Sequence, residues 1–195
     1  MRNLIATAAA ILLLAACGNQ NGNQQAQKEA PVPQREGITF GELILADTNE
    51  FGGALEALIP YTTTNGTTDT LNINLLYEMD KETCELFGVG MIEEADINFD
   101  GTKDLQIRVG NFNAAGNTVY EGFVWNNETG TFVCIPEYYD IFDPEINEED
   151  KSISGSFREW MDGVEYVEGT VYKWVNDTLT LTDQWSEEFT LDDEE

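Results

Sequence analysis

The strongest constraint on the fold is a regular alternation of apolar and polar residues over much of the chain. Residues 71–77 alternate in this way, and so do residues 105–109. Residues 119–125 follow the same rule, although the polar Glu121 interrupts the apolar row. A period of two places successive side chains on opposite faces of a strand. Each of these segments is therefore predicted to be a half-buried β-strand.

Further strands are predicted in the C-terminal half, where β-rich segments are separated by turn residues. The turn cluster at 126–130 is followed by a β-rich run at 131–135, which is a hairpin pattern. Residues 153–160 and 164–175 form two more β-rich segments, and another follows at 179–182. Strands thus recur at short intervals, as they do in antiparallel β proteins.

These patterns predict one antiparallel all-β domain over residues 38–190, a meander that curls into a propeller-like or sandwich form. At most one short helix is expected. Its predicted position is 51–59 with Asn49 as its N-cap, although two glycines in this segment lower its helix propensity. The acidic tail at 191–195 is expected to be solvated.

The first 16 residues have the composition of a secretory signal peptide. Arg2 supplies a positive start, and residues 4–16 form an apolar run that is shorter than the roughly 20 residues of a membrane span. The run ends in Leu14-Ala15-Ala16-Cys17-Gly18, which resembles the bacterial lipobox. This resemblance implies cleavage before Cys17 and lipid on its thiol. The alternative is an ordinary signal peptide followed by a chance cysteine.

Lipid on Cys17 would tether the protein to a membrane, since two or three acyl chains anchor stably. No second apolar run of spanning length follows, so we expect a tethered protein in the cell envelope. Gly18 stands where some enterobacterial lipoproteins carry an inner-membrane aspartate, and by this resemblance the outer membrane is favoured, on either face. Residues 17–37 are rich in Asn and Gln and are expected to form a flexible stalk.

The charge of the chain limits its partners. It has 9 Lys and Arg against 37 Asp and Glu, a formal net charge of −28. Removal of the leader, which contains Arg2, gives 8 − 37 = −29. Such a chain repels nucleic acid and anionic lipid and attracts cations and basic proteins. The alternative is that the acidity only keeps an exported protein soluble.

The chain contains no histidine, which limits its chemistry. Ser-His-Asp and Cys-His catalysis and histidine-based zinc sites are excluded. Paired carboxylates could still hydrolyse glycans, but no pair is marked out by its neighbours. We therefore assign no catalytic residue and expect a protein that is not an enzyme.

The segment 96–105 has the spacing of a calcium-binding loop. Oxygen-bearing side chains stand at loop positions one, three, five and nine, a glycine stands at six, and the carbonyl at seven is a further donor. The candidate ligands are Asp96, Asn98, Asp100, Thr102 and Asp104. Oxygen ligands in a flexible loop suit Ca²⁺. An EF-hand is excluded because Ile107 occupies position twelve. The alternative is a solvated acidic turn.

This loop, followed by a strand, resembles the calcium loop of FG-GAP and integrin-α-type β-propeller repeats. More of the chain is similar to propeller-like calcium-binding lipoproteins that include bacterial lysozyme inhibitors. The matching segments are 96–105, 123–132, 142–145 and 172–179. The resemblance implies bound Ca²⁺ and a basic protein such as lysozyme as partner. The alternatives are a structural or glycan-binding surface component and, less favoured, an acid-pair glycan hydrolase.

Two cysteines remain besides Cys17, and an exported protein can hold a disulfide. A bridge between Cys84 and Cys134 would close a loop of about 50 residues and contribute roughly 4 kcal/mol. The alternative is two buried free thiols.

The acidic run at 143–150 is either a solvated loop or a docking surface for a basic partner. The tryptophans are expected to pack on strands rather than to form a sugar platform: Trp125, Trp160, Trp174 and Trp185.

Overall fold

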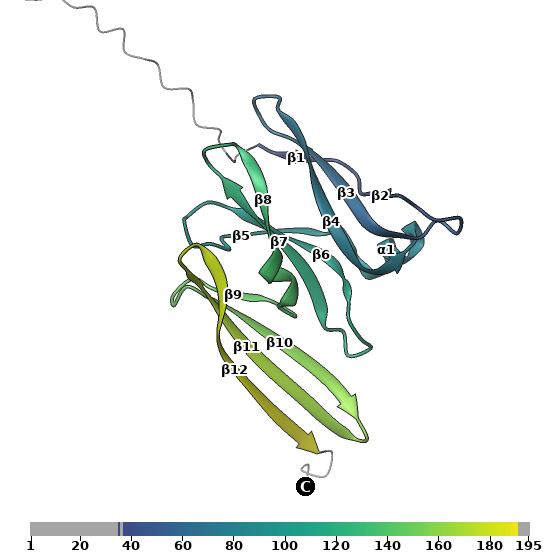
Figure 1. The fold of residues 1–195 in the computed structure, drawn as a ribbon, viewed down its shortest axis with the longest axis vertical. Coiled ribbons are helices and arrows are strands. Elements are labelled where there is room, and N and C mark those ends of the chain that lie inside the picture. The colour runs from purple at the N-terminus through teal and green to yellow at the C-terminus, as the bar shows by residue number, and fades with distance from the viewer. Residues whose placement is uncertain (1–34, 36, 191–195) are drawn as a thin grey trace, which may run out of the picture. The chain divides into compact units, whose positions relative to one another are not determined.

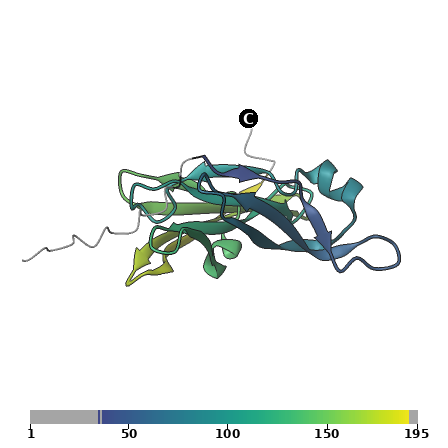
Figure 2. The same ribbon diagram turned by 90° about the horizontal axis from the view of Figure 1, so that it is seen from above.

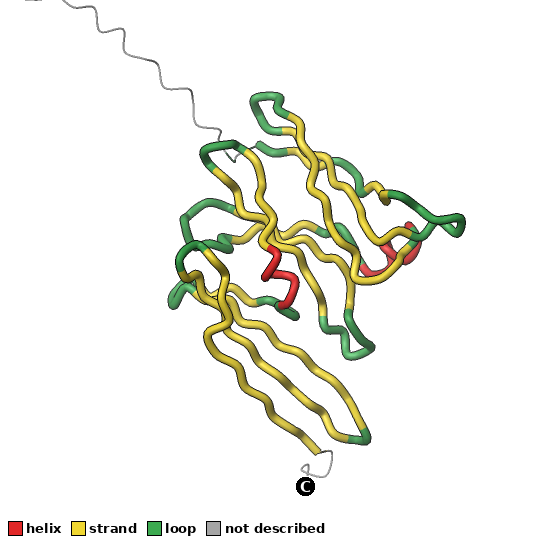
Figure 3. The backbone as a smooth tube through the Cα atoms, in the orientation of Figure 1, coloured by secondary structure: helices red, strands yellow, loops and turns green. Residues whose placement is uncertain are grey.

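The computed structural model describes residue 35 and residues 37–190. The predicted signal peptide, Cys17, most of the predicted stalk and the acidic tail lie outside the described residues. The described part contains three antiparallel sheets of four strands each, one α-helix and one 3-10 helix (Figures 1 and 3). The antiparallel all-β prediction is confirmed. No strand of one sheet pairs with a strand of another, and none of the sheets closes into a barrel within the described range.

The first sheet comprises β1 (Thr39–Phe40), β2 (Ile44–Ala46), β3 (Ala54–Thr62) and β4 (Thr68–Met79). Because β4 pairs along one edge of β3, the short strands β1 and β2 share the other edge. Alternate residues of β4 point into the core, as its apolar alternation predicts.

The helix prediction at 51–59 is wrong, because this segment turns into a strand. The Asn49 Oδ1 accepts hydrogen bonds from the backbone N–H groups of Phe51 (2.8 Å) and Gly53 (3.0 Å). The asparagine therefore stabilises a turn instead of a helix N-terminus. The chain then enters β3, where Ala57 and Ile59 are buried on the core face.

The α-helix of the described part, α1, runs from Lys81 to Phe87. Asp80 caps it by accepting a hydrogen bond from the backbone N–H of Thr83 (2.8 Å), and Gly88 ends it in the left-handed conformation (φ 65°). Figure 2 shows α1 well separated from the 3-10 helix. Within residues 37–190 there is no helix with the length and apolar character that a membrane crossing requires.

The central sheet contains β5 (Ile92–Ala95), β6 (Asp104–Asn111), β7 (Thr118–Asn126) and β8 (Thr131–Ile135) in sequential order. Strands β6 and β7 are buried on both faces. One face of the central sheet packs in a core that also contains residues of the first sheet. The other face meets the 3-10 helix and a second core that includes residues of the C-terminal sheet.

The 3-10 helix η1 (Pro136–Asp140) packs directly on the central sheet. Its Tyr138 is fully buried and donates a hydrogen bond from its hydroxyl to the Gln106 Oε1 (2.7 Å). Gly122 makes this approach possible, because a Cβ atom at this position would lie 2.6 Å from the Tyr138 Cγ. The glycine in β7 is thus required by the close packing of η1.

The C-terminal sheet contains β9 (Glu145–Asn147), β10 (Ser152–Met161), β11 (Val164–Val175) and β12 (Thr178–Thr190), again in sequential order. The start of β10 and the end of β11 contribute to the second core. The opposite end of the sheet has little cover, and β12 is exposed at every position except Leu179.

Candidate functional site

The loop with calcium-loop spacing joins β5 to β6 at one end of the central sheet. Ile97 anchors it because its side chain is fully buried in the second core and its carbonyl accepts a hydrogen bond from the Trp174 Nε1 (2.8 Å). Gly101 adopts a left-handed backbone (φ 89°), as the glycine at loop position six allows. Arg35 secures the far end by donating to the Lys103 carbonyl (2.7 Å).

Three of the predicted ligands are drawn together by hydrogen bonds within this loop. The Asp96 carboxylate accepts from the backbone N–H groups of Asp100 (3.0 Å) and Gly101 (2.8 Å). The Asn98 Oδ1 also accepts from the Asp100 N–H (3.1 Å), and the Asn98 amide donates to the Asp100 carboxylate (3.2 Å). Two carboxylates and one amide oxygen therefore lie around the same turn.

Asp104 occupies a different position from these three residues. It is fully buried at the start of β6. Its Oδ2 accepts from the backbone N–H groups of Ile97 (2.9 Å) and Asn98 (3.3 Å), and its Oδ1 accepts from that of Trp125 (2.8 Å). Both oxygens are thus engaged by the backbone, and the side chain ties the start of the loop to β7.

Burial dominates the electrostatics of Asp104. Loss of solvent raises the pKa of its carboxyl to about 6. The three backbone hydrogen bonds oppose this rise in the pKa because they favour the charged form, whereas the Asp100 carboxylate adds to it. Asp104 is therefore a structural brace of the loop in this conformation.

An open hollow of about 450 Å³ lies beside the turn. Asp96 and Asp100 line it together with Glu148, from the turn between β9 and β10, and Lys103 and Lys151 also border it. Spacing could not identify Glu148, which is 52 positions after Asp96 and reaches the loop only through the fold (148 − 96 = 52). In the sequence, the acidic run at 143–150 indicates only a solvated loop or a docking surface, and it does not identify Glu148 as a neighbour of this loop.

The donor set fits an oxygen-binding cation only in part. Within the described residues, no group of three or more His, Cys, Asp or Glu side chains is placed to hold a metal ion. The loop offers two carboxylates and an amide oxygen in addition to the predicted Thr102 carbonyl, while the Thr102 hydroxyl accepts a hydrogen bond from the Asn127 amide (3.4 Å). Because Ca²⁺ also accepts carbonyl and water oxygens, this set remains chemically suited to it. Calcium binding stays a prediction.

The two remaining cysteines are free thiols, so the disulfide is absent from the structure. Cys84 is buried in α1 against the first core, whereas Cys134 is exposed on β8. Burial and then Asp80 raise the pKa of the Cys84 thiol. Partial desolvation, with the Glu121 and Glu137 carboxylates, raises the pKa of Cys134 to about 11. Neither cysteine has the lowered pKa of a nucleophile.

Glu121 is a buried acid that the sequence marked only as a break in an apolar row. It is 3% exposed, and its Oε1 accepts from the backbone N–H (3.0 Å) and the side-chain amide (2.7 Å) of Asn74. Its Oε2 has no hydrogen-bond partner within the described part. Burial raises the pKa of this carboxyl. The residue links the central sheet to β4.

The tryptophans divide into two groups. Trp125 is buried and Trp174 packs against the second core, as predicted. Trp160 and Trp185 are instead 52% and 48% exposed. By the strand register both lie on one face of the C-terminal sheet, and the exposed Phe189 shares it.

Comparison with known proteins gives little further information. No protein-family model matches this sequence, and no curated protein matches it. A solved structure described as "Structure of a Xanthomonas Type IV Secretion System related protein" is 12% identical in sequence, with a TM-score of 0.45. The alignment covers 84% of this chain and 93% of that chain. A similarity at this level supports no conclusion about function.

Proposed function

We propose that this chain is a membrane-tethered, calcium-binding, non-catalytic envelope lipoprotein that binds a basic macromolecule, with inhibition of a cationic lysozyme as its leading activity. The observation that carries the proposal is the charge, 37 Asp and Glu against 9 Lys and Arg without any histidine. The negative electrostatic field of such a surface speeds the encounter with a positively charged partner and disfavours anionic partners.

The tether rests on the lipobox-like segment at 14–18. Lipid on Cys17 would hold the β domain at a membrane, with the outer membrane favoured, and residues 17–37 would give it reach. The test is mass spectrometry of the protein from bacterial membranes. A mass for a diacylated or triacylated N-terminal Cys17 is expected, and the variant Cys17→Ser should be found without lipid.

The proposed calcium site would use oxygen atoms of the β5–β6 loop. Asp96, Asn98 and Asp100 would supply side-chain oxygens, the Thr102 carbonyl a further one, and Glu148 is the nearby acid from the acidic run. A bound Ca²⁺ would offset the repulsion among these carboxylates. Asp104 would act on the site indirectly, because it fixes the backbone from which Asn98 projects.

Thermal unfolding tests the calcium site. The free energy of unfolding of the wild type should rise by about 2.7 kcal/mol when free calcium is about 100 times the Kd. The double variant Asp96→Ala/Asp100→Ala should lose this rise and behave alike in calcium and in chelator. The double variant Glu187→Ala/Glu188→Ala removes the same charge from exposed positions of β12 and is the control. A calcium response shared by all three proteins would rule out this loop as its source.

Enzyme assays test the partner. The protein should inhibit a cationic lysozyme, and the inhibition should weaken as salt increases because long-range attraction is screened. Hydrolysis of peptidoglycan fragments by the protein alone would contradict the non-catalytic proposal. Inhibition that is indifferent to salt would contradict the role of charge.

A glycan-binding surface component is a second candidate, favoured by one observation. Trp160, Trp185 and Phe189 are about half exposed on one face of the C-terminal sheet, and exposed apolar patches of this kind mark interaction sites. Saturable quenching of tryptophan fluorescence by soluble peptidoglycan fragments, lost in Trp185→Ala, would support this function. An unchanged spectrum would exclude it for these glycans.

A further inference from the structure

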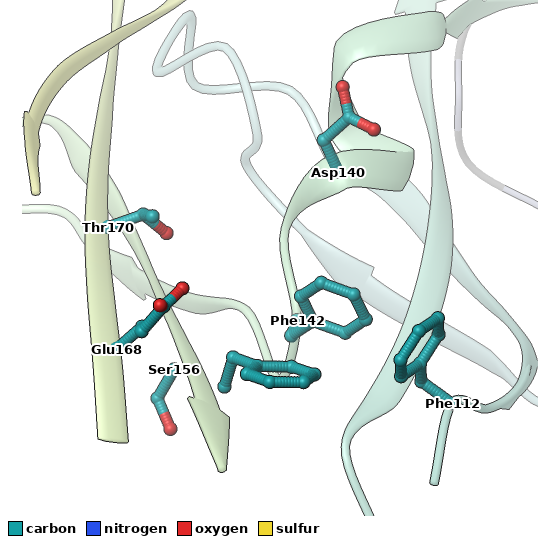
Figure 4. A pocket seen from close by; sticks show the side chains of 7 residues that line it. Phe112, Asp140, Phe142, Ser156, Glu168 and Thr170 are labelled. Carbon is teal, nitrogen blue, oxygen red and sulfur yellow. The ribbon is translucent and has the colours of Figure 1, made fainter. Parts of the chain in front are cut away.

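A separate pocket of about 310 Å³ lies among the β6–β7 turn, the end of η1, and strands β10 and β11. It combines aromatic rings with carboxylates, and its lining does not overlap the β5–β6 loop. Its lining includes Phe112, Asp140, Phe142, Phe157, Glu168 and Thr170. Figure 4 shows this pocket from close by.

Three phenylalanines from different parts of the fold form one wall. The ring centroids of Phe142 and Phe157 are 5.0 Å apart, and those of Phe112 and Phe142 are 5.4 Å apart at an interplanar angle of 71°. Phe112 and Phe157 complete the triangle at 5.7 Å. The Phe112 side chain is nevertheless 47% exposed, so the cluster is accessible from solvent. The face of each ring carries negative potential that attracts cations.

Carboxylates border this aromatic wall. Glu168 and Thr170 extend from the same strand, β11, toward the phenyl rings, and Asp140 lies at the end of η1 across the pocket (Figure 4). Within the described residues, neither acidic side chain forms a hydrogen bond or an ion pair. The chain has only 9 basic residues, four of which form the ion pairs found in the described range.

We propose that this pocket binds the guanidinium group of an arginine side chain presented by the basic partner. This inference rests on the partner class proposed above. A guanidinium can stack flat on a phenyl ring and donate two parallel hydrogen bonds to one carboxylate. Its apolar stem can cover the remaining ring surface. The aromatic wall and the Glu168 carboxylate meet both requirements at once.

Other kinds of occupant suit the pocket less well. A neutral apolar ligand would remove water from Asp140 and Glu168 without replacing their hydrogen bonds, which is unfavourable. A divalent metal ion needs several oxygen ligands, whereas most of this lining is phenyl. A lysine ammonium fits the charge, but as a compact and strongly hydrated group it cannot stack as a guanidinium does.

Titration of the full chain with N-acetyl-arginine methylamide, followed by NMR, tests the pocket directly. Saturable shifts are expected for the ring protons of Phe112, Phe142 and Phe157. The Kd should rise at least about fivefold in Glu168→Gln, and the lysine analogue should bind the wild type at least about threefold more weakly. Shifts spread evenly over acidic surfaces, or equal binding of the two analogues, would overturn the proposal.

The matched control is Glu128→Gln, which makes the same change in charge in the β7–β8 turn and leaves the pocket lining intact. It should bind the arginine probe as the wild type does, and equal weakening in both variants would leave only a general field effect. Phe112→Ala, at a half-exposed position, is a second variant and should also weaken binding. Saturable arginine binding without any lysozyme binding would preserve the pocket and reject the proposed partner. Lysozyme binding without arginine binding would reject the pocket and preserve the proposed partner.

Discussion

The central and C-terminal sheets have the same number of strands and the same sequential antiparallel order, but they differ in burial. Strands β6 and β7 are covered on both faces, whereas β12 is exposed at all positions but one. Whether other parts of the fold cover a sheet therefore decides whether its apolar residues stabilise the folded chain or remain available to contact a partner. The central sheet supports the β5–β6 loop, and the C-terminal sheet contributes Phe157, Glu168 and Thr170 to the aromatic pocket and carries an aromatic face.

A pair of matched leucines gives the largest expected contrast between these sheets. Leu105 in β6 is 0% exposed, and Leu181 in β12 is 43% exposed. Leu105→Ala should lower the free energy of unfolding by about 3 kcal/mol, because it removes buried methylene groups and leaves a cavity. Leu181→Ala should lower it by less than about 1 kcal/mol. Urea denaturation of both variants measures the difference, and similar losses would mean that β12 is covered in solution.

The support that the central sheet gives to the loop predicts a second effect of similar size. Asp104→Ala would leave the backbone N–H groups of Ile97, Asn98 and Trp125 without their acceptor. An unsatisfied buried donor costs about 1–3 kcal/mol, so a loss of about 3 kcal/mol in unfolding free energy is expected. Asp100→Ala, at an exposed position of the same loop, should cost less than about 1 kcal/mol in chelator.

A loss in Asp104→Ala that matched the loss in Asp100→Ala would show that the buried carboxylate is not the brace. The calcium response adds a second measurement to this pair. If the loop binds calcium as proposed, Asp104→Ala should weaken the binding through the loop backbone, whereas Asp100→Ala should weaken it by removal of a proposed ligand.

Strands with strong alternation were predictable from the sequence. The β-rich runs at 131–135 and 164–175 have the same bounds as β8 and β11. The segment 51–59 was misassigned, because the Asn49 side chain fits a helix cap and a turn equally well until its tertiary context is known. The true helix, Lys81–Phe87, was missed because a helix of two turns has too little apolar periodicity to stand out.

The candidate site was predictable only as far as spacing determines it. The spacing from Asp96 to Asp104 identified the loop and its glycine. It could not show that Asp104 turns toward the Trp125 N–H, because that contact depends on the packing of β6 against β7. It also could not place Glu148, or the three phenylalanines of the pocket, since these residues meet only in the folded chain.

The buried Glu121 predicts a pH-dependent effect of intermediate size. Burial raises the pKa of its carboxyl in the folded state above the unfolded value. Its stabilising contribution is therefore fully present below the unfolded pKa and is lost as the pH rises through the folded pKa. Glu121→Gln keeps an acceptor for Asn74 and should stabilise the protein by about 1 kcal/mol at pH 8 but have little effect at pH 4. Urea midpoints at both values test this.

Glu168→Gln, the same substitution at an exposed position of β11, serves as the control for Glu121→Gln, because a surface substitution changes the free energy of unfolding little. An equal effect of Glu121→Gln at pH 4 and pH 8 would show that the pKa of this carboxyl does not differ between the folded and unfolded states, as it would not if the unpaired Oε2 were solvated.

The smallest expected effect lies at the distal end of the exposed sheet. Phe189→Ser replaces a side chain that is half exposed on the aromatic face and has Glu165 opposite it on β11. Because its ring already contacts water, the substitution should change the free energy of unfolding by less than about 1 kcal/mol. Urea midpoints of wild type and variant, each at a low and a high protein concentration, test this. A larger loss that grows with concentration would show that copies of the chain cover this face, and the contrast between the two sheets would then hold for the isolated monomer alone.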